Sequence, residues 1–113
     1  MESASYCLVL VTAPEEESAR IIAGRLVEEK LAACVNLIRG VDSLYRWEGE
    51  VEEDREVLLI IKSRTELMAS HLVPLIHSLH PYQVPEVIAL PIVGGSQEYL
   101  DWLGTEIITG EGR

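Results

Sequence analysis

The apolar positions of the first third of the chain predict a strand followed by a helix. A continuous apolar run at residues 6–11 is typical of a central strand buried on both faces. Further apolar residues then recur at helical spacing from Ala19 to Leu31, which predicts an amphipathic helix packed on a sheet. Thr12 and Glu15 have the spacing of a capping box, so this helix is expected to begin directly after the strand.

The next segment predicts a long antiparallel hairpin. Its arms are residues 33–47 and 51–62, its turn is Glu48-Gly49-Glu50, and Arg39-Gly40 predicts a bend or bulge in the first arm. At about 3.3 Å per residue, arms of this length extend beyond the sheet of so small a domain. The tip is therefore expected to bury itself against something other than its own core.

A second amphipathic helix is predicted between Met68 and Leu79. Ser63 and Glu66 repeat the capping-box spacing ahead of it. Pro74 falls inside the helical pattern, and an interior proline costs about 3 kcal/mol or forces a kink. We therefore expect a bend near Ser70 or a break of the helix into two pieces.

The remaining segments complete an α+β pattern in a single domain spanning residues 1–113. Residues 87–90 predict a strand, Pro91 marks it as an edge or a bulge, Gly94-Gly95 predicts a turn, and Ser96 is expected to cap a short C-terminal helix. The order is strand, helix, long hairpin, helix, strand, short helix, which is the ferredoxin-like split βαβ sandwich with both main helices on one face of an antiparallel sheet. Such a sheet leaves an open face and open edges, which favours a closed homo-oligomer.

Composition and charge narrow the classes of partner. Hydrophobic residues make up 48% of the chain and Phe is absent, so the core is expected to be aliphatic. Nineteen acidic residues against nine basic ones give a net charge of −10, which argues against a nucleic-acid partner and makes cations the natural counter-charge. Solubility alone also accounts for this acidity, since the densest acidic run, residues 48–56, is typical of a solvated turn.

The cysteines and the hydropathy pattern predict a soluble, cytoplasmic protein. Cys7 and Cys34 do not form a Cys-x-x-Cys pair, and the N-terminal apolar run is too short for a signal sequence. No stretch approaches the roughly 20 apolar residues of a membrane span. We therefore expect no membrane association, with Cys7 in the core.

The strongest candidate for binding is the loop His80-Pro81-Tyr82-Gln83-Val84-Pro85-Glu86. Its prolines stiffen the backbone, so that the loop can aim an imidazole, a phenol and a carboxylate at a ligand. His80 suits Cu or Zn, and the alternative is a histidine that caps a helix C-terminus. His77 lies three residues earlier and could share a metal with His80, but exposed surface positions are favoured for His77 and His71.

Further candidate residues lie outside or at the end of that loop. Glu86 could complete a ligand set or form a salt bridge with Lys62, and Lys62 itself is either an anion-binding group or half of an ion pair. Cys34 could supply a thiolate, but a small buried hydrophobe is favoured. Three aromatic residues could line a small-molecule pocket between subunits or simply pack in an interface: Tyr45, Trp47 and Tyr82.

Six motifs follow one another along the chain: Thr12-Ala13-Pro14, Leu31-Ala32-Ala33-Cys34-Val35-Asn36, Ser43-x-Tyr45-x-Trp47-x-Gly49, Lys62, His80-Pro81-Tyr82-x-x-Pro85-Glu86 and Tyr99-Leu100-x-Trp102. In order and spacing they resemble the CutA divalent-ion-tolerance family across residues 9–103. The resemblance implies a ferredoxin-like homotrimer whose long hairpins extend onto neighbouring subunits, similar in shape to the PII signalling proteins. It also implies an association with copper and other divalent cations.

This sequence differs from the copper-binding members of the family at two of the implied ligand positions. The resemblance implies that those members use a Cys directly before the Thr-Ala-Pro segment and a His-His pair before Pro-Tyr. Here the first position is Val11 and the pair is Leu79-His80. One of the three implied ligands remains, which weakens the expectation of tight copper binding through that set.

Two functions are therefore expected from the sequence. The first is a homotrimeric divalent-cation-tolerance protein that binds Cu(II) or Zn(II) at a metal site including His80 and Glu86. The second is a PII-like signalling or assembly module whose inter-subunit cleft, lined by Tyr45, Trp47, Lys62, Tyr82 and His80, holds a small anionic ligand or a partner protein. No nucleophile–base pair, phosphate loop or closed metal-ligand set is present in the sequence, so we expect neither an enzyme nor an organic cofactor.

Overall fold

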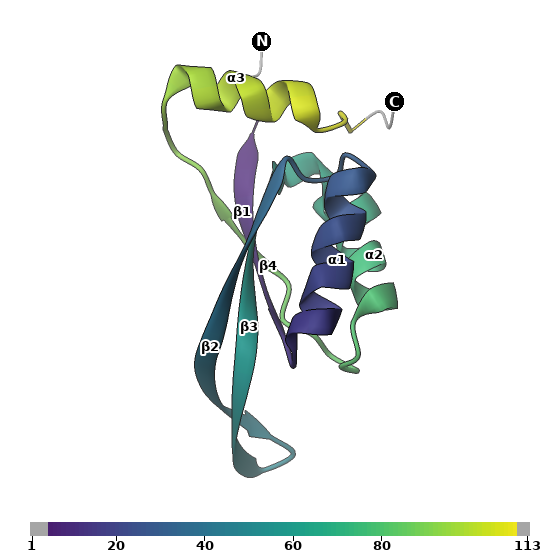
Figure 1. Ribbon diagram of the computed structural model, residues 1–113, viewed down its shortest axis with the longest axis vertical. Helices are drawn as coiled ribbons and strands as arrows, with labels where there is room; N and C mark the ends of the chain where they lie inside the picture. The colour runs from purple at the N-terminus through teal and green to yellow at the C-terminus, as the bar shows by residue number, and fades with distance from the viewer. Residues whose placement is uncertain (1–4, 111–113) are drawn as a thin grey trace.

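The computed structural model describes residues 5–110 and has two main layers, an antiparallel four-stranded sheet and a pair of helices packed on one of its faces (Figure 1). The strand order is β2-β3-β1-β4. The elements are β1 (Tyr6–Ala13), α1 (Glu16–Glu28), β2 (Cys34–Trp47), β3 (Glu50–Arg64), α2 (Val73–Leu79), β4 (Ile88–Pro91) and α3 (Gln97–Glu106). The predicted α+β ferredoxin-like arrangement is confirmed.

The core fills the space between the sheet and helices α1 and α2. Every second residue of β1 points into it, and these residues meet the apolar stripes of both helices and the facing residues of β3. Most of the fully buried side chains are aliphatic, as the composition predicts: they include Val9, Val11, Ile22, Leu26, Leu59, Ile61, Leu72 and Ile76. Cys7 is buried among them, as expected.

The opposite face of the sheet carries an apolar patch that the described residues leave partly exposed. Residues paired across an antiparallel ladder lie on the same face, and Leu10 is opposite Ile60 on one side and Ile88 on the other. Leu8, opposite Leu90, extends this apolar patch. The prediction that β1 is buried on both faces is therefore wrong within this chain: its residues alternate between buried and half-buried, because α1 and α2 cover only one face.

The hairpin of β2 and β3 extends far past the body of the domain (Figure 1). The register shifts between Ile38 and Val41, so the bulge predicted at Arg39-Gly40 is confirmed, and Gly40 has a φ of 72°. The strands reverse at Glu48 and Gly49, both with positive φ. The overhang gives the chain an extent of 48 Å along its longest axis against 26 and 24 Å along the others.

The break predicted at Pro74 is also confirmed. A 3₁₀ turn (Thr65–Leu67) and a π-helical turn (Met68–Leu72) precede α2, and Pro74 lies in the first turn of α2. Proline has no N–H and its ring would clash with the carbonyl four residues earlier. The wider π turn relieves that clash, so α2 proper is only seven residues long.

The capping boxes predicted at Thr12 and at Ser63 are wrong, whereas the predicted cap of α3 is confirmed. Thr12 belongs to β1, and α1 begins after Glu15 with no side-chain cap. Ser63 belongs to β3, and its hydroxyl donates to the Leu31 carbonyl over 2.6 Å. Strand pairing holds both residues away from the helix ends. At α3, Ser96 Oγ accepts from the Tyr99 N–H over 3.4 Å.

Among residues 5–110, no helix combines the length and the apolar character needed to cross a bilayer.

Candidate functional site

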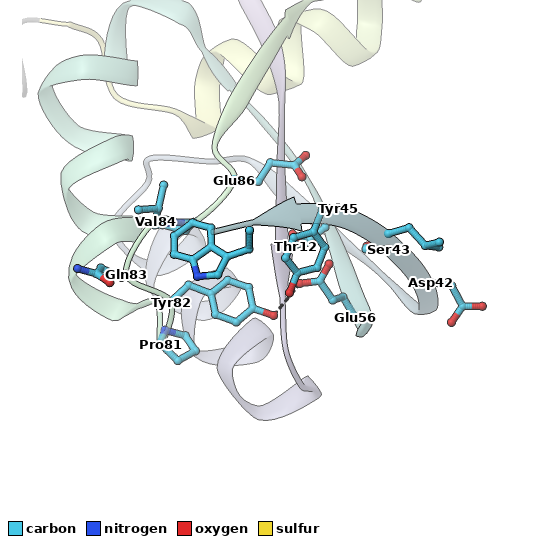
Figure 2. Close-up of a pocket in the computed structure, with 13 residues that line it drawn as sticks. Thr12, Asp42, Ser43, Tyr45, Glu56, Pro81, Tyr82, Gln83, Val84 and Glu86 are labelled. Atoms are coloured by element: carbon cyan, nitrogen blue, oxygen red, sulfur yellow. Dashed lines mark hydrogen bonds between the residues drawn. The ribbon is translucent and has the colours of Figure 1, made fainter. Parts of the chain in front are cut away.

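The loop that follows α2 packs beside the hairpin and leaves an open groove between them (Figure 2). The groove has a volume of about 870 Å³, which lies in the range of small-molecule sites. Its residues come from the end of β1, both hairpin strands and the loop. We call it the hairpin groove, and it is lined by Thr12, Asp42, Ser43, Leu44, Tyr45, Trp47, Glu56, Pro81, Tyr82, Gln83, Val84, Pro85 and Glu86.

His80 anchors the loop to the end of β1. The side chain is 7% exposed, and its Nε2 lies 2.7 Å from the Thr12 carbonyl oxygen while its Nδ1 lies 3.1 Å from the Tyr82 backbone nitrogen. A carbonyl can only accept and an amide can only donate, so the ring carries its proton on Nε2 and accepts at Nδ1. Both ring nitrogens are thus engaged, and metal binding by His80 would require one of these hydrogen bonds to open.

Glu56 and Tyr82 form the buried wall of the hairpin groove. The Tyr82 hydroxyl donates to Glu56 Oε2 over 2.7 Å, and Glu56 is only 5% exposed (Figure 2). Burial of the phenol and its hydrogen bond to the carboxylate raise the pKa of Tyr82 well above its usual value. Glu56 belongs to the acidic run that the sequence assigned to a solvated turn, and the apolar run starting at the next residue, Val57, was the one signal of its burial.

The exposed wall of the groove carries the aromatic residues of the hairpin. Tyr45 and Trp47 are each partly exposed and line the groove, as the sequence proposed for a ligand pocket. The Tyr45 hydroxyl donates to Asp54 on the neighbouring strand. This hydrogen bond, with added repulsion from nearby carboxylates, raises the pKa of Tyr45 to about 12.

Lys62 lies outside the hairpin groove. It pairs with Cys34 and Leu8 in the sheet, and its ammonium group donates to Asn36 Oδ1 over 2.5 Å with Cys34 Sγ 3.9 Å away. Within residues 5–110 it forms no ion pair with Glu86 or any other carboxylate. Of the four residues predicted for a ligand pocket, the fold therefore brings three together and leaves Lys62 aside.

The groove is acidic, but its carboxylates are spread out. Glu86 lines it, as do Asp42 and Glu56, and no Lys or Arg is among the lining residues. Arg55 reaches Asp42 from the side, with its Nε 3.1 Å from Oδ1. Nowhere in the described part of the chain do three or more His, Cys, Asp or Glu side chains come close enough to hold one metal ion. The arrangement suits cations better than anions, without forming a closed metal site.

A family model, sequence relatives and solved structures all match this chain to the same family. The family model described as "CutA1 divalent ion tolerance protein" matches residues 7–106. The divalent-cation tolerance protein CutA of Thermus thermophilus is 56% identical over 96 residues, covering 85% of this chain and 92% of that protein. The chloroplastic CutA of Arabidopsis thaliana is 52% identical over 96 residues, and the chain spans about half of its length, 52%.

Solved structures agree with the fold as well as with the sequence. The divalent cation tolerance protein of Thermus thermophilus superposes with a TM-score of 0.87 at 53% identity, covering 90% of this chain and 98% of that one. The CutA1 structure from Oryza sativa gives a TM-score of 0.89 at 46% identity, covering 94% of this chain and 96% of that one.

Proposed function

The chain belongs to the CutA1 divalent ion tolerance family, and from this premise we propose that it is a homotrimeric binding protein that takes up divalent cations. The family model and the Thermus thermophilus relative are named for divalent-cation tolerance and not for a reaction. The observation that carries the proposal is the uncovered apolar face of the sheet, which a monomer would leave in water. Assembly removes that face from solvent, and the acidic surface of the assembly attracts cations.

The open face supports assembly because its apolar residues are contiguous. Leu8, Leu10 and Ile60 occupy its centre, and Ile88 and Leu90 continue it on β4. Contiguous exposed apolar surface of this kind marks an interaction site. β4 is also an edge strand whose outer backbone groups are unpaired within the described chain, and the overhanging hairpin would reach a neighbouring copy.

The assembly is tested by changing one exposed isoleucine on the open face of the sheet and, as a control, one exposed isoleucine on the helix layer. Ile88 is 51% exposed on the open face and Ile21 is 48% exposed on the outer side of α1, so Ile88→Glu and Ile21→Glu are matched in residue and exposure. Light scattering should give about three times 12.6 kDa for the native protein and for Ile21→Glu, and a lower mass for Ile88→Glu. A monomeric native protein, or a trimeric Ile88→Glu, would refute the proposed interface.

The proposed cation binding draws on the net charge of −10 and on the carboxylates at the groove. Exposed Glu86 at the end of the stiff loop is the accessible oxygen ligand of the predicted pair, since His80 already holds the loop to β1. Cu(II) and Zn(II) accept both oxygen and imidazole ligands. We propose that a bound ion is shared between Glu86 and ligands that the partner subunits bring into the cleft.

Calorimetric titration of the assembled protein with Zn(II) and Cu(II) tests this site. Saturable binding should weaken in Glu86→Gln, because an exposed carboxylate is lost without disturbing the loop. His77→Ala is the control, since His77 is exposed one turn before the loop and forms no part of the groove. His80→Ala reports separately on the loop anchor. Unchanged binding in Glu86→Gln and His80→Ala would refute these ligands, and the absence of saturable uptake would refute the proposed function.

The alternative of a PII-like module for a small anionic ligand lacks its cationic group. Lys62, the one basic residue expected in the pocket, is engaged with Asn36 away from the groove. An anion in the hairpin groove would face carboxylates with no lining Lys or Arg to balance it. We therefore favour the cation-binding function.

A further inference from the structure

The hairpin groove contains a buried carboxylate with unused capacity to accept hydrogen bonds. Glu56 is 5% exposed, and among residues 5–110 its carboxylate receives one hydrogen bond, from the Tyr82 hydroxyl to Oε2. An ionised carboxylate accepts several hydrogen bonds, and Oε1 of Glu56 is not among the buried atoms of residues 5–110 that lack a partner, so this oxygen is open to the groove. The buried wall of the groove therefore offers an acceptor for a donor that comes from outside the described chain.

The surroundings of this carboxylate favour a donor that is positively charged. Tyr45, Trp47 and Tyr82 present aromatic rings to the groove, and the faces of such rings attract cations. The hydroxyls of Tyr45 and Tyr82 donate to the carboxylates of Asp54 and Glu56, so this wall carries negative charge, in agreement with the raised pKa of both tyrosines. Among residues 5–110, no Lys or Arg lines the groove.

The placement of the carboxylates along the groove favours an organic cation with two charged ends over a metal ion. The described carboxylates do not converge on one point, whereas Asp42 and Gln83 lie at opposite ends of the groove (Figure 2). Asp42 is already paired with Arg55, which leaves Glu56 and, at the loop, Glu86 as separate acceptors. A metal ion needs several ligands within one coordination shell, while two ammonium groups on a flexible chain can reach two separated carboxylates.

We propose that the hairpin groove is a binding site for a small aliphatic diamine. One ammonium group donates to the free oxygen of Glu56 and lies against the rings of Tyr45, Trp47 and Tyr82. The other ammonium group lies near Glu86. This site shares Glu86 with the proposed metal site but differs from it in chemistry, because it also requires the buried carboxylate of Glu56 and the aromatic rings.

Calorimetry of the full chain in its native assembly tests the proposal with 1,4-diaminobutane as the probe. The neutral control is 1,4-butanediol, which has the same carbon chain and hydrogen-bonding ends without the charge. At an ionic strength of about 0.15 M, which screens weak surface attraction, the diamine should bind saturably and the diol should not. Equal binding of both compounds, or non-saturating uptake of the diamine, would overturn the proposal.

Two carboxylate variants locate the site. Glu56→Gln keeps an acceptor for the Tyr82 hydroxyl but removes the charge, and it should weaken diamine binding by at least about tenfold, the effect of losing a charge-assisted hydrogen bond. Glu53→Gln makes the same charge change at an exposed residue of the same strand outside the groove, and it should leave the affinity unchanged. Equal losses in both variants would overturn the site, because the diamine would then respond only to net charge.

A third variant keeps the test independent of the buried charge. Trp47→Leu changes a partly exposed side chain on the hairpin, which lies outside the core, and it should reduce diamine affinity because the ring face is lost. Unchanged affinity in both Trp47→Leu and Glu56→Gln would overturn the site. Zn(II) titrations on the same variants separate the two proposals: retained metal binding with lost diamine binding supports both, and metal binding without any diamine binding leaves the proposed function standing and refutes this inference.

Discussion

Removing the Tyr82 hydroxyl should destabilise the fold through its buried partner. The substitution Tyr82→Phe deletes a 2.7 Å hydrogen bond to Glu56 Oε2 while retaining the ring, and it leaves a carboxylate that is 5% exposed without its donor. Hydrogen bonds to charged groups contribute roughly 1.5–3 kcal/mol, so we expect a loss of this size in the free energy of unfolding. In a Glu56→Gln background the same deletion removes a neutral hydrogen bond and should cost only about 1 kcal/mol.

Urea unfolding of the four proteins of this double-mutant cycle measures the difference. Protein concentration must be fixed, because assembly couples to stability. The two costs of Tyr82→Phe should differ by roughly 0.5–2 kcal/mol, the difference between a charged and a neutral hydrogen bond, and this lies within the range measured for directly interacting pairs. If Tyr82→Phe costs the same with Glu56 as with Gln at this position, the carboxylate does not hold the hydroxyl and the account of the buried wall is incorrect.

The same contact predicts how stability changes in alkaline solution. The pKa of Tyr82 is raised in the folded state, so the folded chain keeps this proton at pH values where the unfolded chain, with a tyrosine pKa of about 10, has lost it. The stabilisation is complete below about pH 10 and is lost as the pH rises above it. Tyr82→Phe should reduce this alkaline loss, and a contribution of the same sign from Tyr45, with its pKa of about 12, should remain. An unchanged alkaline profile would contradict the raised pKa.

Two further predictions concern the scaffold. Hydrogen bonds from Arg39, and to a lesser extent from Arg20, hold the pKa of Glu16 at about 2. The ionised Glu16 therefore stabilises the fold above the usual carboxyl pKa, and this contribution is lost as the pH falls toward 2. NMR titration of Arg39→Gln should show a higher pKa for Glu16, and an unchanged value would contradict the pairing. A Cβ on Gly104 would lie 2.5 Å from the Tyr6 hydroxyl oxygen, whereas a Cβ on Gly24 would meet none of the described neighbouring residues within 4 Å. In denaturant unfolding, Gly104→Ala should therefore destabilise the fold by about 1–3 kcal/mol, and Gly24→Ala should stabilise it by up to about 1 kcal/mol. Equal effects of the two substitutions would refute the packing at Gly104.

Sequence patterns predicted much of the fold because they depend on local chemistry. The bulge at Arg39-Gly40 follows from a glycine at positive φ, and the break before α2 follows from the missing N–H and the ring of Pro74. The cap of α3 was also predictable, because the Ser96 hydroxyl bonds to a backbone N–H only three residues away. The two capping boxes failed because Thr12 and Ser63 are held in strands, so that pairing with distant residues overrode a local signal.

The candidate site was only partly predictable. The stiff loop indicated His80, Tyr82 and Glu86 as chemically capable residues, and the alternating hairpin strand indicated Tyr45 and Trp47. Glu56 was missed because its neighbours in the sequence are exposed acidic residues, and only its contact with the loop shows that it is buried. Lys62 was expected to bind an anion or to form an ion pair, yet the register places it beside Cys34 and Leu8, where it donates to Asn36.

Local patterns along the chain were enough to define the order of elements, the overhang of the hairpin, the aliphatic core and the acidic charge, since spacing and side-chain chemistry carry that information. Which residues meet became visible only in the folded chain: His80 engages Thr12 and Tyr82 through both ring nitrogens, and Glu56 lies buried against the loop. The order of elements predicted that one face of the sheet would stay open, but which apolar residues meet on that face became visible only in the fold. These outcomes depend on strand register and on which face the helices cover, and both are settled by packing between segments far apart in the chain.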